Sequence, residues 1–287
     1  MLVDLQEILK IAENQKIAVG AFNTPNLESL CAVIQAAEDL QLPVIVSAAQ
    51  CHETLAPLAL IGPAMVQQAS QASVPVCVHL DHGEDLEYLK RALEIGFTGI
   101  MYDGSALPYE QNLQNTISAV QMAAPYNCGV EAELGSMGKR QEGLAEDGAG
   151  VSDSTKIYTD PGQARDFVEQ TGIDALACSF GTTHGLYLEE PQLDFDVVKK
   201  VRKATNNIPV VMHGGSGVSD TDFRHAIEAG VRKINYFTYM DKAGGAAACE
   251  YCASLNAEEP AFFTEISQKA QSAMKENVKA AMKIFAK

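Results

Sequence analysis

Short runs rich in β-branched and other apolar residues recur along this chain, and stretches with helical periodicity separate them. The eight runs are Ile17–Phe22, Val44–Ala48, Val74–Leu80, Gly99–Tyr102, Cys128–Glu133, Asp174–Ser179, Pro209–His213 and Lys233–Tyr236. Between them, apolar residues return every three or four positions, as in Glu28–Leu40, Asp85–Ile95, Tyr109–Ala124, Gly162–Gln170, Asp194–Lys203 and Asp220–Ala229. Because strands that alternate with helices form parallel β–α–β units, the pattern predicts an α/β fold, a (β/α)8 TIM barrel, as a single domain over residues 1–287.

The ends of several predicted helices carry residues that favour a helix start or stop. Asp160 and Ser219 are typical residues before the first helical turn, and Gly96 and Gly230 are typical residues after the last one. These positions agree with the limits that the apolar periodicity predicts.

Two segments depart from the alternation of strands and helices. The tail from residue 262 to 287 is amphipathic and rich in lysine, so we expect a C-terminal helical extension that packs over the barrel or at a subunit contact. The stretch from Gly135 to Asp160 is long and poor in large apolar residues, and long structureless loops in compact domains usually have a function. We interpret it as a mobile lid over the active-site end of the barrel.

The composition restricts the partners and the location of the protein. A formal net charge of -16 would repel the phosphates of nucleic acid, so we expect no nucleic-acid binding. We also expect no membrane insertion, since no apolar run approaches the ~20 residues that a membrane helix needs. The first residues lack the basic region of a signal peptide, which predicts a cytoplasmic protein.

Three histidines stand at equivalent places in the predicted barrel. His82, His184 and His213 follow or end the third, sixth and seventh apolar runs, and each adjoins a glycine. The active site of a TIM barrel lies at the carboxyl ends of its strands, so these three side chains should meet there. Three neutral imidazoles are a common set of catalytic zinc ligands, because they leave the fourth tetrahedral position open. A lone histidine would more often be a structural hydrogen-bonding residue, but three at equivalent ends favour a metal site.

Carboxylates accompany these histidines. Asp81 should lie beside the metal, where it either transfers a proton or orients a histidine. Asp103 and Glu133 end the fourth and fifth runs and suggest a second cation, although Asp103 is also placed to cap the chain that follows. Glu131 shares a strand face with Glu133, so the sequence alone does not separate their roles. His79, deeper in the same run as Asp81, is expected to be a packed interior residue.

Glycine-rich segments at the last two strands suggest a phosphate site. Gly214, Gly215 and Gly217 surround Ser216, and the segment from Asn235 to Thr238 ends the eighth run. Exposed backbone N–H groups at these two strands form the usual phosphate site of the barrel fold, whereas tight turns alone would also use glycine.

Taken together, the segments H-L-D-H, E-A-E-L-G, T-H-G-x-Y, H-G-G-S-G and K-I-N resemble, in content and order, the class II metal-dependent ketose-bisphosphate aldolases, the family of fructose- and tagatose-bisphosphate aldolases. The resemblance runs from about Ala18 to about Thr238. It implies catalytic zinc on His82, His184 and His213, with Asp81 as the proton donor or acceptor at the aldehyde-derived oxygen. It also implies a homodimer or homotetramer and a phosphorylated sugar substrate.

The resemblance extends to the remaining site residues. A carbon acid/base on the mobile loop corresponds to Glu142, although Gln141 stands at the expected spacing from Glu133. A second divalent or monovalent cation would use Asp103 and Glu133. The residues that correspond to contacts with dihydroxyacetone phosphate and the rest of the substrate are Asn23, Gly185, Gly214, Gly215, Ser216, Asn235, Tyr236, Phe237 and Thr238.

The sequence departs from the family where the distal phosphate of a bisphosphate binds. A segment similar to P-R-Y-Y-x-R supplies arginines there, but the comparable stretch here reads Pro260-Ala261-Phe262-Phe263-Thr264-Glu265. Ala49 stands where a Ser or Thr often contacts the same phosphate. Separately, Phe237 replaces the acidic residue typical of the family after Asn235 and Tyr236, a change that other members tolerate. Loss of bidentate cations and gain of a carboxylate should disfavour a second phosphate.

The sequence therefore favours a zinc aldolase that cleaves a phosphorylated ketose to dihydroxyacetone phosphate and an aldehyde. A fructose or tagatose 1,6-bisphosphate aldolase proper is one alternative. A non-catalytic, metal-binding relative with a regulatory role is another, because the acid loop is altered. A zinc hydrolase on the same barrel is disfavoured, since the ligands are spread over three strands without an early H-x-H.

Overall fold

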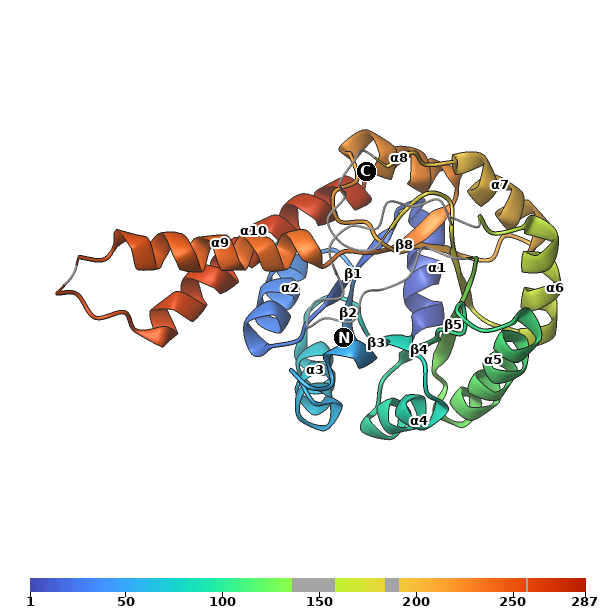
Figure 1. Cartoon of the computed structure of the whole chain (residues 1–287), viewed down its shortest axis with the longest axis horizontal. Helices are drawn as coiled ribbons and strands as arrows, with labels where there is room; N and C mark the ends of the chain where they lie inside the picture. The colour runs from blue at the N-terminus through green and yellow to red at the C-terminus, as the bar shows by residue number, and fades with distance from the viewer. Residues whose placement is uncertain (136–157, 184–190, 257) are drawn as a thin grey trace.

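The computed structural model of the protein describes residues 1–135, 158–183, 191–256 and 258–287. Its strands form a closed, all-parallel barrel in which each strand pairs with the next and β8 pairs with β1 (Figure 1). The strands are β1 (Val19–Asn23), β2 (Val44–Ala49), β3 (Val76–Gly83), β4 (Gly99–Tyr102), β5 (Gly129–Leu134), β6 (Ala175–Cys178), β7 (Val210–Met212) and β8 (Val231–Asn235). This confirms the (β/α)8 TIM barrel predicted from the alternating pattern.

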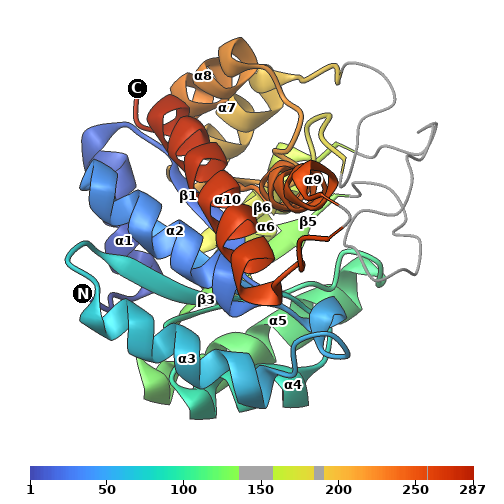
Figure 2. The same cartoon turned by 90° about the vertical axis from the view of Figure 1, so that its left-hand side faces the viewer.

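Helices surround the barrel (Figure 2). They bury the outward-facing apolar residues of its strands. They are α2 (Leu27–Leu40), α3 (Leu58–Gln71), α4 (Leu86–Ile95), α5 (Tyr109–Ala123), α6 (Pro161–Thr171), α7 (Phe195–Ala204) and α8 (Asp220–Ala229). The C-terminal helix α10 (Phe263–Phe285) completes the ring, because it packs against α2, α8 and β1. Short 3-10 turns follow β2 (η1, Gln50–His52) and α5 (η2, Ala124–Tyr126).

Helix α9 (Thr238–Ser254) leaves the end of β8 and pairs with the first part of α10. Together the two helices form an arm that projects from the side of the barrel (Figure 1). Phe262, directly before α10, and Phe263, the first residue of α10, are 55% and 77% exposed. The predicted C-terminal extension is therefore present, and its second half packs over the barrel.

Helix α1 (Leu5–Gln15) lies across the amino-terminal end of the barrel. Its buried face, with Leu5, Ile8, Leu9 and Ala12, forms one apolar cluster with inward-facing strand residues such as Ile45 and Met101. The lower barrel is thus filled by hydrocarbon, which excludes water from that end. The polar interior residues gather above this layer, toward the carboxyl ends of the strands.

The predicted helix limits are largely confirmed. The side chains of Asp160 and Ser219 accept hydrogen bonds from backbone N–H groups of the first turns of α6 and α8, and Gly96 and Gly230 follow the last turns of α4 and α8. Helices α1 and α3 were not among the predicted elements. No helix in the described part of the chain has the length and apolarity needed to cross a membrane.

Candidate active site

Two consecutive residues at the end of β3, Asp81 and His82, both face the mouth of the barrel. A regular strand would point them to opposite sides. His82 instead has a φ of 47°, and the β3–β4 register shifts between Leu80 and Gly83. The sequence predicted that His82 lies beyond the end of its strand. The predicted end of this strand was wrong, since β3 continues to Gly83. The left-handed backbone at His82 turns its side chain to the same side as that of Asp81.

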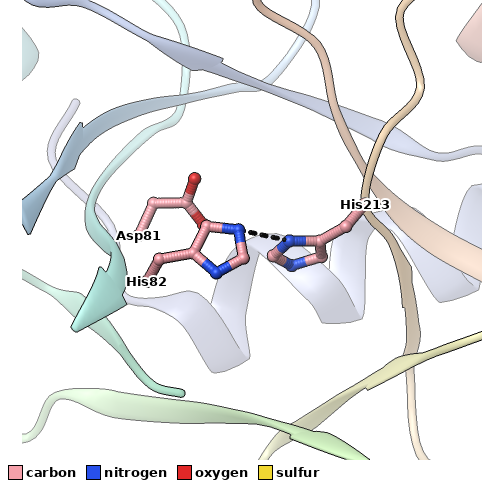
Figure 3. A group of neighbouring side chains, drawn as sticks. All are labelled: Asp81, His82 and His213. Carbon is pink, nitrogen blue, oxygen red and sulfur yellow. Dashed lines mark hydrogen bonds between the residues drawn. The ribbon is translucent and has the colours of Figure 1, made fainter. Parts of the chain in front are cut away.

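His82 and His213 meet across the barrel with a carboxylate behind each ring. Nε2 of His82 and Nδ1 of His213 lie 2.9 Å apart (Figure 3). The other nitrogen of each ring faces an acid: His82 Nδ1 lies 2.8 Å from Asp103 Oδ2, and His213 Nε2 lies 2.9 Å from Glu131 Oε1. An ionised carboxylate only accepts hydrogen bonds, so each imidazole donates its N–H to its acid. The two nitrogens that face each other therefore both present lone pairs.

This arrangement fits a divalent cation. Burial and the neighbouring His82 ring lower the pKa of His213, which keeps its ring neutral near pH 7. Neutral imidazoles oriented by carboxylates are the usual form of histidine in metal sites. A carboxylate oxygen of Asp81 lies near the two rings, since one ligand atom each of Asp81, His82 and His213 falls within 4.8 Å of the others. Of the predicted zinc ligands, the structure brings His82 and His213 together, while His184 lies outside the described residues.

A second group shares His82. One ligand atom each of His82, Asp103 and Glu133 lies within 4.8 Å of the others. The set contains two carboxylates and one imidazole and is a candidate for the second cation. Asp103 also accepts from the backbone N–H and the hydroxyl of Ser105, at 3.1 and 2.7 Å. Both the cation and the capping interpretations of Asp103 are therefore compatible with its contacts.

Asp81 is held by two amides. Asn235 Nδ2 donates to Oδ1 at 3.0 Å, and Asn23 Nδ2 donates to Oδ2 at 3.3 Å. Burial alone would raise the pKa of Asp81, but the neighbouring His82, His213 and Lys233 outweigh it and hold this pKa well below its ordinary value. The carboxyl group is thus ionised at neutral pH and able to accept a proton.

The loop after β7 lies against the start of α9. A Cβ on Gly214, where φ is 64°, would lie 2.2 Å from the backbone oxygen of Thr183, so no larger residue fits there. Ser216 Oγ accepts from the backbone N–H of Phe237 at 3.2 Å, and Gly215 N–H donates to the backbone oxygen of Asn235 at 3.1 Å. The expected phosphate-binding segments, including Thr238 as the first residue of α9, are therefore neighbours.

Tyr236 differs from the other residues of this group. Its ring packs edge-on against Phe22 and Phe285, with centroid distances of 5.9 and 6.1 Å, in the layer between strands and helices. The structure thus brings its backbone, but not its ring, to the predicted substrate site. Gly185 and the loop acid Glu142 lie outside the described residues, as does the segment predicted to form a lid.

Two interior residues near the site received no functional role from the sequence. Lys233 is fully buried on β8, with Nζ 2.8 Å from Glu131 Oε2. Its position two residues before Asn235 could have revealed it, because alternate strand residues face the same side. Burial and Lys233 act in opposite senses on Glu131, and the net effect lowers the pKa of this acid to about 2. His79 is buried in the barrel as predicted, with a pKa lowered to about 3, chiefly by burial.

His52, near the mouth of the barrel, also received no functional role from the sequence. It belongs to η1, and its ring lies 5.4 Å from that of Phe237, measured between centroids. Gln50 fixes this turn, since its Oε1 accepts from the backbone N–H groups of Glu84 and Asp85 at 2.9 and 3.3 Å. Burial lowers the pKa of His52 more than the charge of Asp81 raises it, so the ring is neutral near pH 7.

Comparison with known proteins gives the same fold and family along the whole chain. A family model described as fructose-bisphosphate aldolase class-II matches residues 3–287. The uncharacterized protein YdjI of Escherichia coli K12 is 39% identical over 288 residues, which cover 99% of this chain and 98% of that protein. The crystal structure of the YdjI aldolase has a TM-score of 0.86 at 37% identity, over 99% of this chain and 97% of that one.

A more distant crystal structure agrees. The putative fructose-1,6-bisphosphate aldolase of Coccidioides immitis has a TM-score of 0.83 at 28% identity, over 98% of this chain and 95% of that one. The match to the family model leaves out only the first two residues. The chain therefore belongs to the class II fructose-bisphosphate aldolase family.

Proposed function

We propose that this protein is a zinc-dependent aldolase that reversibly cleaves a ketose 1-phosphate to dihydroxyacetone phosphate and an aldehyde. The observation that carries the proposal is the pair of facing nitrogens on His82 and His213, each ring backed by a carboxylate, beside the ionised Asp81. Membership of the class II aldolase family supports the same chemistry. His184 would be the third ligand of the ion.

The residues divide the reaction between two proton transfers. His82, His184 and His213 would hold a divalent ion, which would supply Lewis-acid stabilisation of the negative charge that develops beside the ketone. Asp81 removes the proton of the C4 hydroxyl as the C3–C4 bond breaks, which releases the aldehyde. The electron pair of that bond passes to the dihydroxyacetone phosphate half, and a proton delivered to C3, in our proposal from Glu142, completes the reaction.

Amide and backbone groups would hold the substrate. Asn23 and Asn235 already donate to Asp81, so they orient the base toward the hydroxyl that loses its proton. Gly185, Gly214, Gly215 and Ser216, with the backbone of Tyr236 and Phe237 and with Thr238, would hold the 1-phosphate and the adjoining hydroxyl. Asp103 and Glu133 together with His82 are our candidates for a second cation.

The preference for a single phosphate rests on the residues near the far end of the substrate. Ala49 offers no hydrogen-bond donor from its side chain, and His52 is neutral. The segment from Pro260 to Glu265 stands on the arm, away from the mouth of its own barrel (Figure 1). We also propose that the chain forms a homodimer or homotetramer. An arginine from a neighbouring subunit would change the preference, which makes the substrate comparison decisive.

Steady-state kinetics on a ketose 1-phosphate and its 1,6-bisphosphate test the proposal. A missing bidentate arginine–phosphate contact is worth roughly 1.5–3 kcal/mol, so kcat/KM should favour the monophosphate by about 10- to 150-fold. The ketose 1-phosphate is the control for the matching 1,6-bisphosphate, because the two substrates differ only in the distal phosphate. Efficient cleavage with a clear preference for the bisphosphate would instead indicate a fructose or tagatose 1,6-bisphosphate aldolase. No cleavage of either substrate by the zinc-loaded protein would favour a regulatory relative.

A further inference from the structure

A buried lysine joins the two halves of the proposed site. Lys233 lies on β8, and its side chain is 0% exposed. Nζ lies 2.8 Å from Glu131 Oε2 and donates to Asn235 Oδ1, also at 2.8 Å. Burial of an ammonium group in a barrel interior is costly unless it is paired, so both contacts are needed to hold it there. One contact leads toward the metal ligands and the other toward Asp81.

The first branch runs through Glu131 to His213. Oε2 of Glu131 pairs with Lys233, while Oε1 accepts the N–H of His213 Nε2 at 2.9 Å. The two oxygens therefore have different partners, which together hold the carboxylate in place. A histidine whose Nε2 carries the proton presents the lone pair of Nδ1, and this is the nitrogen that faces His82. Lys233 thus acts on the metal ligand through the carboxylate.

The second branch runs through Asn235 to Asp81. Because Oδ1 of Asn235 accepts from Lys233, its Nδ2 must point the other way, where it donates to Asp81 Oδ1 at 3.0 Å. Without a cation on Oδ1, the amide could rotate by 180° and present an oxygen to the Asp81 carboxylate, which would repel it. The lysine therefore selects the amide orientation that holds the proposed base.

We propose that Lys233 is a positioning residue that sets both the tautomer of His213, through Glu131, and the orientation of Asp81, through Asn235. This inference rests on the proposed function only for the Asp81 branch. The His213 branch concerns metal binding by the protein itself, which does not need a substrate. Lys233 contacts Glu131 and Asn235, and its effect on His213 and Asp81 is indirect.

Zinc affinity of the metal-free protein tests the first branch. In Lys233→Met, Glu131 loses its partner cation, and the affinity measured by competition with a chromophoric chelator should fall about 10- to 100-fold. The double variant Lys233→Met/Glu131→Gln should bind zinc no more weakly than Glu131→Gln alone, because the lysine acts through that carboxylate. Lys275→Met is the matched control, since Lys275 pairs with Asp39 on the outer surface and should keep wild-type affinity.

Two further readouts separate positioning from a purely structural role. In the metal-free wild-type protein, nitrogen NMR should find the proton of His213 on Nε2, and cobalt-loaded Lys233→Met should show shifted visible absorption bands. At saturating metal, Lys233→Met should lose kcat more than it raises KM, because Asp81 is misoriented. If Lys233→Met does not fold, the double variant, which removes both buried charges, still gives the affinity comparison.

Three results would overturn the inference. The first is wild-type zinc affinity in folded Lys233→Met, and the second is a double variant in which the losses of zinc affinity from the two single substitutions add. The third is a proton on Nδ1 of His213 in the metal-free protein. A weakened metal site together with no aldolase activity in the wild type would keep the first branch and reject the proposed function. The two failures are therefore distinguishable.

Discussion

At the scale of single residues, the site depends on a local break in strand geometry. The positive φ of His82 turns its ring toward His213 while Asp81 keeps its inward position. Sequence reasoning could identify both side chains, because histidine and aspartate at a strand end suggest a metal site. It could not assign the tautomers, since these follow from Asp103 and Glu131, which approach from other strands.

Replacement of Asp81 by Ala tests its role as the base. We expect zinc to remain bound, since the three histidines are unchanged, and we expect kcat for cleavage to fall on the order of 10²-fold or more, the usual contribution of a positioned acid or base. Carbon–hydrogen exchange at bound dihydroxyacetone phosphate, measured with deuterated solvent, should fall less if Glu142 carries it out. Equal losses of cleavage and exchange would show that Asp81 does not act only on the aldehyde side.

At the scale of elements, α1 seals the end of the barrel opposite the site and is tied there by ion pairs. Glu13 accepts from Arg202 Nη2 at 2.8 Å and from Arg232 Nε at 2.9 Å. Partial burial raises the pKa of Glu13, but the hydrogen bonds and charges of Arg202 and Arg232 outweigh it, so the pKa lies below its ordinary value. The pairs join a helix outside the barrel repeat to α7 and β8.

This network predicts a pH-dependent contribution to stability. A carboxyl whose pKa is lower in the folded state stabilises the fold above its unfolded pKa, and this contribution is lost as the pH falls through the folded pKa. Glu13→Gln should therefore lower the free energy of unfolding by about 1 kcal/mol at pH 7, a modest figure because the Glu13 side chain is 40% exposed and screened by water.

Urea denaturation at pH 7 and near pH 3 measures this effect. The difference between wild type and Glu13→Gln should shrink at the acidic pH, where the wild-type carboxyl also loses its charge. Glu7→Gln, an exposed glutamate on the same helix, is the control and should change little at either pH. A constant difference between wild type and Glu13→Gln at both pH values would contradict the ion-pair explanation.

Most elements could be predicted because their apolar periodicity is strong, and the exceptions have physical reasons. Helix α3 contains Pro63, which disfavours a helix interior, and its apolar residues are not confined to one face. Helix α1 has a clear apolar face but precedes the first strand, so the alternation that revealed the barrel does not include it. The role of Lys233 depends on its ion pair with Glu131 of β5, and the residues next to Lys233 in the sequence do not reveal that pair.

At the scale of the whole molecule, the barrel brings together side chains that are far apart in the sequence. Asn23, Asp81, His213 and Asn235 come from the first, third, seventh and eighth strands or the residues directly after them. Asn23 and Asn235 can both reach Asp81 because the barrel is closed and β8 pairs with β1. The arm of α9 and α10 extends beyond this unit and carries the exposed Phe262 and Phe263, which suits the proposed contact between subunits.

The central claim is that His82, His184 and His213 hold one metal ion on which aldol cleavage depends. Its most direct test is cleavage of a ketose 1-phosphate by the chelator-treated protein during titration with zinc. We predict no activity without metal and full recovery at stoichiometric zinc. His184→Ala and His213→Ala should recover almost none, whereas His225→Ala, at an exposed position of α8, should behave like the wild type. Undiminished cleavage by protein shown to be free of metal, or by His213→Ala, would contradict the account.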